Sequence, residues 1–166
     1  MIDSVFKIDN LPSSRWKECR NLRLEALQAV PIAFGSSYEE EKVLSENEWR
    51  NRIGNAIFAL ENDIPIGMIV AINQSNKKGQ HIANIFSAYV KKSHRGKGVG
   101  YQLITEAVAR LREDNRIRKI KLTVNSKLDS AIKLYKKAGF TEVGVLKKEL
   151  FHEGIYYDEI MMELYS

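Results

Sequence analysis

Hydrophobic residues recur along the chain with two different periods, which predict helices and strands in turn. Between residues 13 and 30 the apolar positions recur every three or four residues, as on the buried face of a helix. Pro12-Ser13-Ser14 is typical of a helix start, and Pro31 ends the pattern. Further on, Ser45 followed three residues later by Glu48 fits a capping box, which predicts a short helix through Trp49 and Ile53.

Shorter segments alternate apolar and polar residues or are continuously apolar, which is typical of strands. The polar turn Glu61-Asn62-Asp63 separates two of them and predicts a hairpin. The segment 82–90 is rich in β-branched and aromatic residues. The predicted strands cover residues 2–8, 56–60, 64–72, 82–90, 117–124, 140–145 and 155–164.

Two more helices interrupt the strands in the second half of the chain. Apolar residues recur every four positions from Val99 to Leu111, which predicts an amphipathic helix. A second apolar face runs from Ala131 to Ala138 and ends at Gly139. The predicted order is β-α-α-β-β-β-α-β-α-β-β, which is a mixed α/β sheet with helices on its faces.

Length and composition limit the class of protein. With 166 residues, of which 44% are hydrophobic and 28% charged, we expect one globular domain over 1–166. The single cysteine, Cys19, cannot form an internal disulfide, and no Cys/His cluster has zinc-ligand spacing. The longest nearly apolar run, 64–72, is far shorter than the roughly 20 residues that span a bilayer. Since the first ten residues also lack a signal-peptide core, we expect a cytoplasmic protein without metal.

The charge is uneven along the chain, although the net charge of +5 is moderate. Four basic residues fall within 91–97 with no acid among them, whereas Glu39, Glu40 and Glu41 form an acidic run. We therefore expect a surface with one basic and one acidic site. A pI near 9.2 is compatible with nucleic acid or with a phosphorylated small ligand. No helix-turn-helix or aromatic ladder supports nucleic acid, which we rank last.

The segment Arg95-Gly96-Lys97-Gly98-Val99-Gly100 lies between a predicted strand and a predicted helix. Glycines there let the backbone turn sharply and approach a ligand, and the free N–H groups of a helix start favour an anion. The segment therefore predicts a phosphate-binding loop. It is not a P-loop, because Gly98 rather than Ser or Thr follows Lys97. It also departs from the dinucleotide fingerprint, because Tyr101 replaces the third glycine.

Two motifs in register resemble the GNAT superfamily of N-acetyltransferases. Arg95-x-x-Gly98-x-Gly100 resembles its pyrophosphate-binding motif, and 131–140 resembles its Ala-Ile-x-Leu-Tyr-x-x-x-Gly-Phe signature. The stretch PIAFGSSYEEE, followed by Trp49, also resembles an acceptor-side region of small members. The resemblance covers the chain in order and is sharpest over 86–146. It implies a GNAT-like α/β fold, with a mixed, mostly antiparallel sheet flanked by helices on both faces.

The resemblance implies that acetyl-CoA is the co-substrate and assigns residues to it. The glycine loop would bind the pyrophosphate, the end of the strand before it would lie beside the acetyl group, and a tyrosine would protonate the departing thiolate. The implied cofactor-binding residues are Ala88, Tyr89, Val90, Arg95, Gly96, Lys97, Gly98, Val99, Gly100, Asn125, Ala131 and Tyr135. Tyr135 is the implied catalytic acid, since a phenol with a pKa near 10 can donate a proton to a thiolate. By itself, Tyr135 would be read as a packed aromatic of the helix core.

The sequence departs from the family pattern in two places. Where members often have an asparagine that contacts the cofactor, this chain has Leu128; Asn125 either replaces it in part or caps a loop. Several members carry a glutamate base in the strand at 82–90, which here holds no acid. The base is therefore left open between a water held by backbone groups and Glu39, Glu40 or Glu41, which would otherwise be a solvated helix face.

These observations predict direct transfer of an acetyl group from acetyl-CoA to a primary amine of a small cationic molecule. The acidic run Glu39–Glu41 is the expected acceptor side. A protein or peptide amine is the alternative acceptor, and a CoA-binding module without transfer is the alternative class, against which Tyr135 argues. We expect neither nucleic acid nor membrane as partner, and leave a homodimer open.

Overall fold

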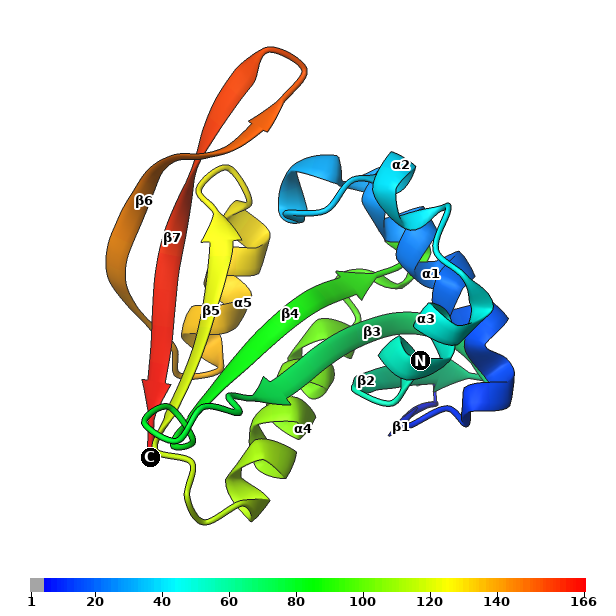
Figure 1. Ribbon diagram of the computed structural model, residues 1–166, viewed down its shortest axis with the longest axis horizontal. Helices are drawn as coiled ribbons and strands as arrows, with labels where there is room; N and C mark the ends of the chain where they lie inside the picture. Colours follow the sequence, from blue (N-terminus) through cyan, green and yellow to red (C-terminus); the bar gives the residue numbers. More distant parts are fainter. Residues whose placement is uncertain (1–4) are drawn as a thin grey trace.

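Across residues 5–166, which are the residues described, the computed structural model shows one seven-stranded sheet (Figure 1). Its order is β1-β2-β3-β4-β5-β7-β6; β4 and β5 run parallel, and all other neighbours are antiparallel. The strands are β1 (Phe6–Asp9), β2 (Ala56–Glu61), β3 (Ile64–Asn73), β4 (Ile82–Val90), β5 (Lys119–Asn125), β6 (Thr141–His152) and β7 (Ile155–Tyr165). The predicted mixed sheet is confirmed; residues 2–4 of the first predicted strand lie outside the described residues.

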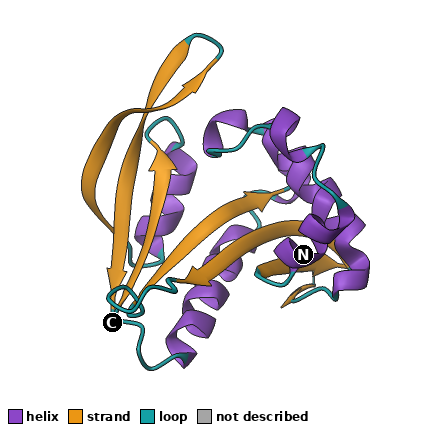
Figure 2. Ribbon diagram, viewed as in Figure 1, coloured by secondary structure: helices purple, strands orange, loops and turns teal. Residues whose placement is uncertain are grey.

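Helices cover both faces of the sheet, as predicted (Figure 2). On one face lie α4 (Val99–Glu113) and α5 (Asp129–Lys137). The other face carries α1 (Trp16–Ala29), α2 (Tyr38–Glu41) and α3 (Glu46–Ile53). The predicted capping box at Ser45 is present at the start of α3. A second one, at Ser37, starts the four-residue helix α2, which the sequence analysis did not predict.

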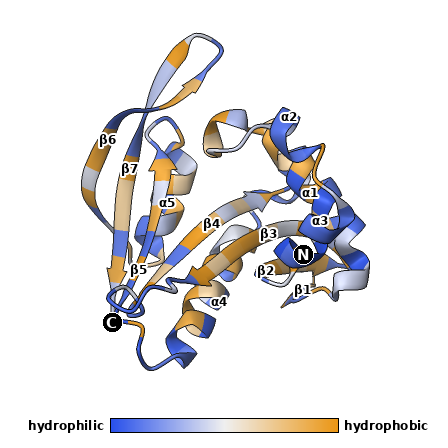
Figure 3. Cartoon of the chain, in the orientation of Figure 1, coloured by the Kyte–Doolittle hydropathy of each residue, from blue (hydrophilic) through white to orange (hydrophobic). Residues whose placement is uncertain are grey.

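The core lies on both sides of the central strands, where the chain is most hydrophobic (Figure 3). In β2, Ile57 and Ala59 pack into the cluster that includes α4, whereas Phe58 and Leu60 pack into the cluster that includes α1. A strand covered on both faces buries every side chain, which explains why 56–60 reads as a continuous apolar run.

The sheet opens between its two parallel strands, and this opening organises the site. β4 pairs with β5 only from Ile82 to Asn84, opposite Lys119 to Lys121, and the strands then diverge (Figure 1). A β-bulge in β4 lies nearby, where Ser87 takes a φ of 55° and the register with β3 shifts. The second half of β4 therefore has no strand partner on the side that faces β5.

β6 is longer than predicted, because it continues beyond Val145 through a charged segment to His152. A register shift between Leu146 and Leu150 lets the strand pass this segment. The side chain of Asp158 stabilises the irregularity, because it accepts hydrogen bonds from the Lys148 N–H at 2.8 Å and from Lys147 Nζ at 2.9 Å. This long-range contact has no counterpart in local sequence periodicity.

Candidate active site

The glycine loop joins the end of β4 to the start of α4. Gly98 is the N-cap of α4 and has a φ of 83°, in the left-handed region that favours glycine. The first intrahelical bond there runs from the Gln102 N–H to the Gly98 carbonyl at 3.0 Å. The N–H groups of Val99, Gly100 and Tyr101 are thus left without intrahelical partners, at the positive end of a helix dipole. A Cβ at Gly98 would meet no atom within 4 Å, so the space above this turn is open to a ligand.

Neighbouring side chains hold this loop in place. A Cβ at Gly100 would lie 3.1 Å from Leu134 Cδ2, so glycine lets α4 and α5 approach closely. Arg95 Nε donates to the Val90 carbonyl at 2.9 Å, while its guanidinium lies over the Tyr89 ring. His94 lies 2.9 Å from Glu61 and ties the loop to β2. The predicted phosphate-binding segment therefore forms the start of α4, and the side chains of Arg95 and Lys97 beside it are exposed.

The last residues of β4 follow the bulge at Ser87, in the part of the strand that no longer pairs with β5. Val90 and Tyr89 pair with β3 through Gly67 and Met68, and Ala88 is half-buried. The Tyr89 hydroxyl donates to Glu25 Oε1 at 3.0 Å. Burial raises the pKa of Tyr89, and its hydrogen bond to Glu25 raises it further. Tyr89 is thus held by α1 and is not free to serve as the leaving-group acid.

Tyr135 is buried in α5 and packs edge-to-face on Phe140, with ring centroids 6.2 Å apart. Its hydroxyl forms no hydrogen bond with any described residue. Burial raises the pKa of Tyr135 to about 12, so the hydroxyl is protonated at neutral pH and can act as a donor. An unpartnered hydroxyl that is always protonated fits the predicted acid; the role itself stays a prediction.

Asn125 and Ala131 contact other parts of the protein and are both at least half-buried. Asn125 is buried at the end of β5, where Nδ2 donates to the Ile32 carbonyl at 2.9 Å and Oδ1 accepts from the Lys127 N–H at 2.9 Å. The amide thus caps a turn and ties β5 to the segment after α1. Ala131 is half-buried against the core. Their contacts with a cofactor stay predictions.

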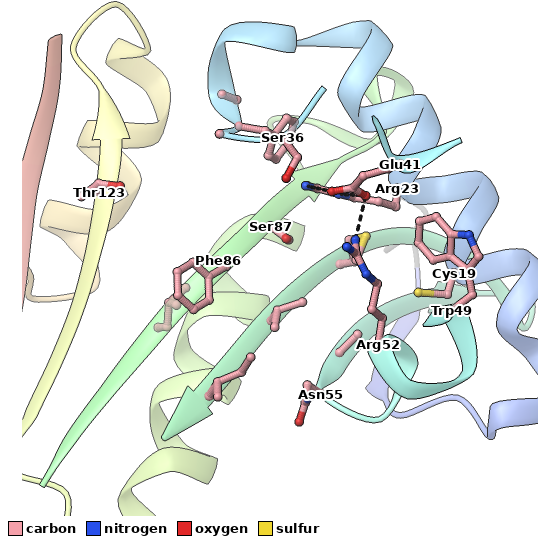
Figure 4. Close-up of a pocket in the computed structure, with 18 of the residues that line it drawn as sticks. Cys19, Arg23, Ser36, Glu41, Trp49, Arg52, Asn55, Phe86, Ser87 and Thr123 are labelled. Atoms are coloured by element: carbon pink, nitrogen blue, oxygen red, sulfur yellow. Dashed lines mark hydrogen bonds and ion pairs between the residues drawn. The ribbon is translucent and has the colours of Figure 1, made fainter. Parts of the chain in front are cut away.

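A pocket of about 480 Å³ lies on the α1 side of the sheet, beside the opening between β4 and β5 (Figure 4). Ser87 and Phe86 of β4 and Thr123 of β5 border it, and Trp49 of α3 lies at its opposite side. Its charged lining residues are Arg23, Glu41, Arg52 and Glu159. The volume lies within the range typical of small-molecule sites.

Three of these charges form one cluster. Glu41 accepts from Arg23 Nε at 3.0 Å and from Arg23 Nη2 at 2.8 Å, and its Oε2 lies 3.0 Å from Arg52 Nη1. Burial alone would raise the pKa of Glu41, but the hydrogen bonds and charges of Arg23 and Arg52 outweigh burial and lower it. Glu41 is thus ionised and matched by two cations, which leaves this side of the pocket with excess positive charge.

The acidic run does not form one surface. Glu39 is exposed and pairs with Lys42, and Glu40 is exposed and caps α2 through Ser37. Neither borders the pocket, whereas Glu41 does. Of the acids expected on the acceptor side, the structure therefore brings only Glu41 to the pocket, already paired.

Sequence reasoning missed Arg23, Arg52 and Glu159. For Arg23 a signal existed, since it stands four residues after Cys19 on the apolar face of α1, where a charge needs a buried partner. Glu159 carries no such signal, because an acid in an alternating strand is ordinary. Glu159 is half-buried, and burial raises its pKa, an effect that the neighbouring Thr123 hydroxyl partly offsets.

The candidate site of this α/β protein thus combines a free helix start with two cations beside it, a diverging pair of parallel strands and a pocket next to the divergence. Residues 16–140 match the family model of the acetyltransferase (GNAT) family. The chain belongs to this family. It is an acyltransferase, and its donor is acetyl-CoA.

Two curated relatives and two solved structures agree with this assignment. YokL, an uncharacterized prophage-derived N-acetyltransferase of Bacillus subtilis, is 32% identical across 84% of this chain and 87% of that protein. The L-amino acid N-acetyltransferase AaaT of Escherichia coli is 27% identical across 71% of this chain and 75% of that protein. A GNAT acetyltransferase from Streptococcus pneumoniae superposes with a TM-score of 0.87 at 20% identity, over 98% of this chain and 100% of that one. The yncA protein of Salmonella typhimurium, solved with acetyl-CoA, gives 0.84 at 16% identity, over 98% and 94%.

No helix among residues 5–166 is both long enough and apolar enough to cross a membrane.

Proposed function

We propose that this protein transfers an acetyl group directly from acetyl-CoA to the primary amine of a small molecule, which arrives as an ammonium cation. One observation carries the proposal. The opening between β4 and β5 has the free helix start of α4 at its β4 end and the pocket of about 480 Å³ on the α1 side. Donor and acceptor can thus meet at the opening without a covalent enzyme intermediate.

The donor side uses the residues that the family resemblance assigned. The N–H groups from Val99 to Tyr101, with Arg95 and Lys97 beside them, would bind the pyrophosphate. The unpaired side of β4 from Ala88 to Val90 would hydrogen-bond the pantetheine arm and the thioester carbonyl. Asn125 and Ala131 would border the arm from β5 and α5. Backbone N–H groups aimed at the carbonyl oxygen would stabilise the oxyanion that forms on attack.

The reaction needs a neutral amine, since an ammonium has no lone pair. After the ammonium loses a proton, its nitrogen attacks the thioester carbon, the C–S bond breaks, and the thiolate leaves. Tyr135 would donate a proton or a strong hydrogen bond to this thiolate, because its hydroxyl is protonated and unpartnered. Acetyl-CoA supplies the activated acyl group. The protein would position the thioester and the amine and would accept and donate the protons that are transferred.

A small acceptor is favoured over a protein amine by the form of the pocket. It is lined from both sides of the sheet opening and from α1 and α3, which leaves room for a compact molecule. The relative AaaT is named for L-amino acids, which supports an amine of that size. We further propose that residues 1–166 act as one domain and that the protein works in the cytoplasm, where it would meet acetyl-CoA.

The test is an acetyl-transfer screen that measures enzyme-dependent release of CoA thiol, with the enzyme-free rate subtracted for each nucleophile. The panel contains the common L-amino acids, spermidine, short alkylamines and peptides with a free N-terminal amine, with hydroxylamine as a minimal nucleophile. We expect turnover with at least one small amine, and we expect no peptide to be acetylated faster than that amine. Faster turnover with a peptide would establish a protein amine as the acceptor. Thiol release no faster than the enzyme-free rate with every nucleophile would refute acetyl transfer.

A further inference from the structure

We propose that Glu159 of β7 accepts the proton that the acceptor ammonium must lose before it attacks the thioester. This inference rests on the proposed function, because it names the proton acceptor in the same pocket. The family resemblance pointed to an acid within β4, where this chain has none. The structure supplies an acid from a different strand.

Glu159 lies where the pocket meets the sheet opening. It pairs directly with Asn125, the last residue of β5, on the far side of the opening from β4. It borders the same pocket as Thr123 of β5 and as Ser87, the residue at the bulge of β4. An amine seated in this pocket and facing the opening therefore has Glu159 on one side and the end of β4 on the other.

Glu159 differs from the other pocket carboxylate in its partners. Glu41 is held by three hydrogen bonds or ion-pair contacts from Arg23 and Arg52. Within the described part of the chain, by contrast, Glu159 forms no ion pair with any lysine, arginine or histidine. A half-buried carboxylate without a cation is costly to keep charged, and an incoming ammonium would offset that cost. The acid proposed here for the acceptor side thus comes from β7 and not from the acidic run Glu39–Glu41.

The groups around Glu159 adjust its basicity in a useful direction. Burial raises its pKa, the neighbouring Thr123 hydroxyl opposes this, and the negative charge of Glu149 on β6 raises it again. Ser87 and Phe86, which border the pocket from β4, carry no charge. A carboxylate with a raised pKa is a better proton acceptor near neutral pH than an ordinary one.

The proton balance is complete with residues already described. The acceptor nitrogen changes from an ammonium to an amide N–H and so loses two protons. Glu159 takes the first, directly or through one water, and releases it to solvent. The second leaves the tetrahedral adduct and is balanced by the proton that the CoA thiolate gains with the help of Tyr135. No oxidant, metal or further co-reactant is required.

The decisive experiment compares Glu159→Gln with the wild type on two kinds of nucleophile. Amines of the panel that exist as ammonium ions at neutral pH need the base, whereas hydroxylamine is largely neutral there and does not. We expect kcat/KM for the ammonium-forming amines to fall by about 10²–10⁴-fold, the usual contribution of general base catalysis. The rate with hydroxylamine and the affinity for acetyl-CoA should stay close to the wild-type values.

Glu149→Gln is the matched control, because it makes the same chemical change on an exposed glutamate of β6 that does not border the pocket. It should retain full activity. Since it removes a charge that raises the pKa of Glu159, the acidic limb of its pH–rate profile should move to lower pH. In Glu159→Gln this limb should instead be replaced by a steady rise with pH that follows the free-amine fraction.

Three results would overturn the role of Glu159 while acetyl transfer itself stands. These are wild-type kcat/KM in Glu159→Gln, an equal loss with hydroxylamine and with ammonium-forming amines, and a wild type that acetylates hydroxylamine only. If the wild type releases thiol no faster than the enzyme-free mixture with any nucleophile, the proposed function fails first, and the role of Glu159 fails with it.

Discussion

Replacing Tyr135 by phenylalanine removes one hydroxyl and tests the leaving-group step directly. The pKa of Tyr135 is about 12, whereas that of an unperturbed thiol is about 8.5. Complete proton transfer from this tyrosine to a free thiolate is therefore uphill by roughly 5 kcal/mol, at about 1.4 kcal/mol per pKa unit. The hydroxyl should act mainly by a hydrogen bond to the charge that develops on sulfur.

That mechanism sets the size of the effect. A hydrogen bond to a charged group contributes about 1.5–3 kcal/mol, which corresponds to a loss of about 10- to 150-fold in kcat. Stability should change little, because the hydroxyl has no protein partner and the edge-to-face contact with Phe140 is kept. We expect a change of less than about 1 kcal/mol in the free energy of unfolding, or about 4 °C in Tm at most.

The assay is steady-state thiol release at saturating acceptor, combined with a melting curve and calorimetry with acetyl-CoA. Added viscogen must leave kcat unchanged, which shows that chemistry limits turnover. A kcat within a factor of two of the wild type under those conditions would remove Tyr135 from the mechanism. Full kcat with a clearly lower Tm would assign it to core packing alone.

Three further predictions concern the glycine loop and the acidic run. Gly98→Asp places a negative charge at the open helix start and should weaken acetyl-CoA binding by about tenfold or more in calorimetry. Gly154→Asp, at another open glycine with positive φ, is the control and should bind acetyl-CoA normally. Equal affinities of the two variants would show that the pyrophosphate does not bind at Gly98. Glu41→Gln leaves Arg23 and Arg52 without their carboxylate partner. It should lower the free energy of unfolding by about 3 kcal/mol and Tm by roughly 6–12 °C, whereas the exposed variant Glu40→Gln should melt like the wild type. Because the folded-state pKa of Glu41 is lowered, its stabilisation is present above about pH 4.3 and is lost as pH falls through the folded-state value. Acid unfolding curves should therefore converge for wild type and Glu41→Gln at low pH, and a constant difference would contradict the ion-pair argument.

Local sequence determined most of the secondary-structure elements and supplied the residues that we propose for the donor side. The periods of apolar residues placed the helices and most strands, because one buried face needs a repeat that matches its geometry. The segment Arg95–Gly100 and the 131–140 signature are each contiguous, and the roles proposed for them depend on backbone N–H groups and on one helix face. Residues that are close together in the sequence are therefore enough to identify these two segments. The C-terminal end of β6 was missed, since the irregularity before it depends on Asp158 in the next strand.

The tertiary structure alone decided which charged groups border the pocket that we propose for the acceptor. Glu41 looked like one of three equivalent acids, until Arg23 from α1 and Arg52 from α3 were brought against it and Glu39 and Glu40 were left in solvent. Glu159 became a candidate only because β7 pairs with β5 beside the sheet opening. Charges in a pocket act through space, over distances that depend on the packing of segments far apart in the chain, and no local pattern records those distances.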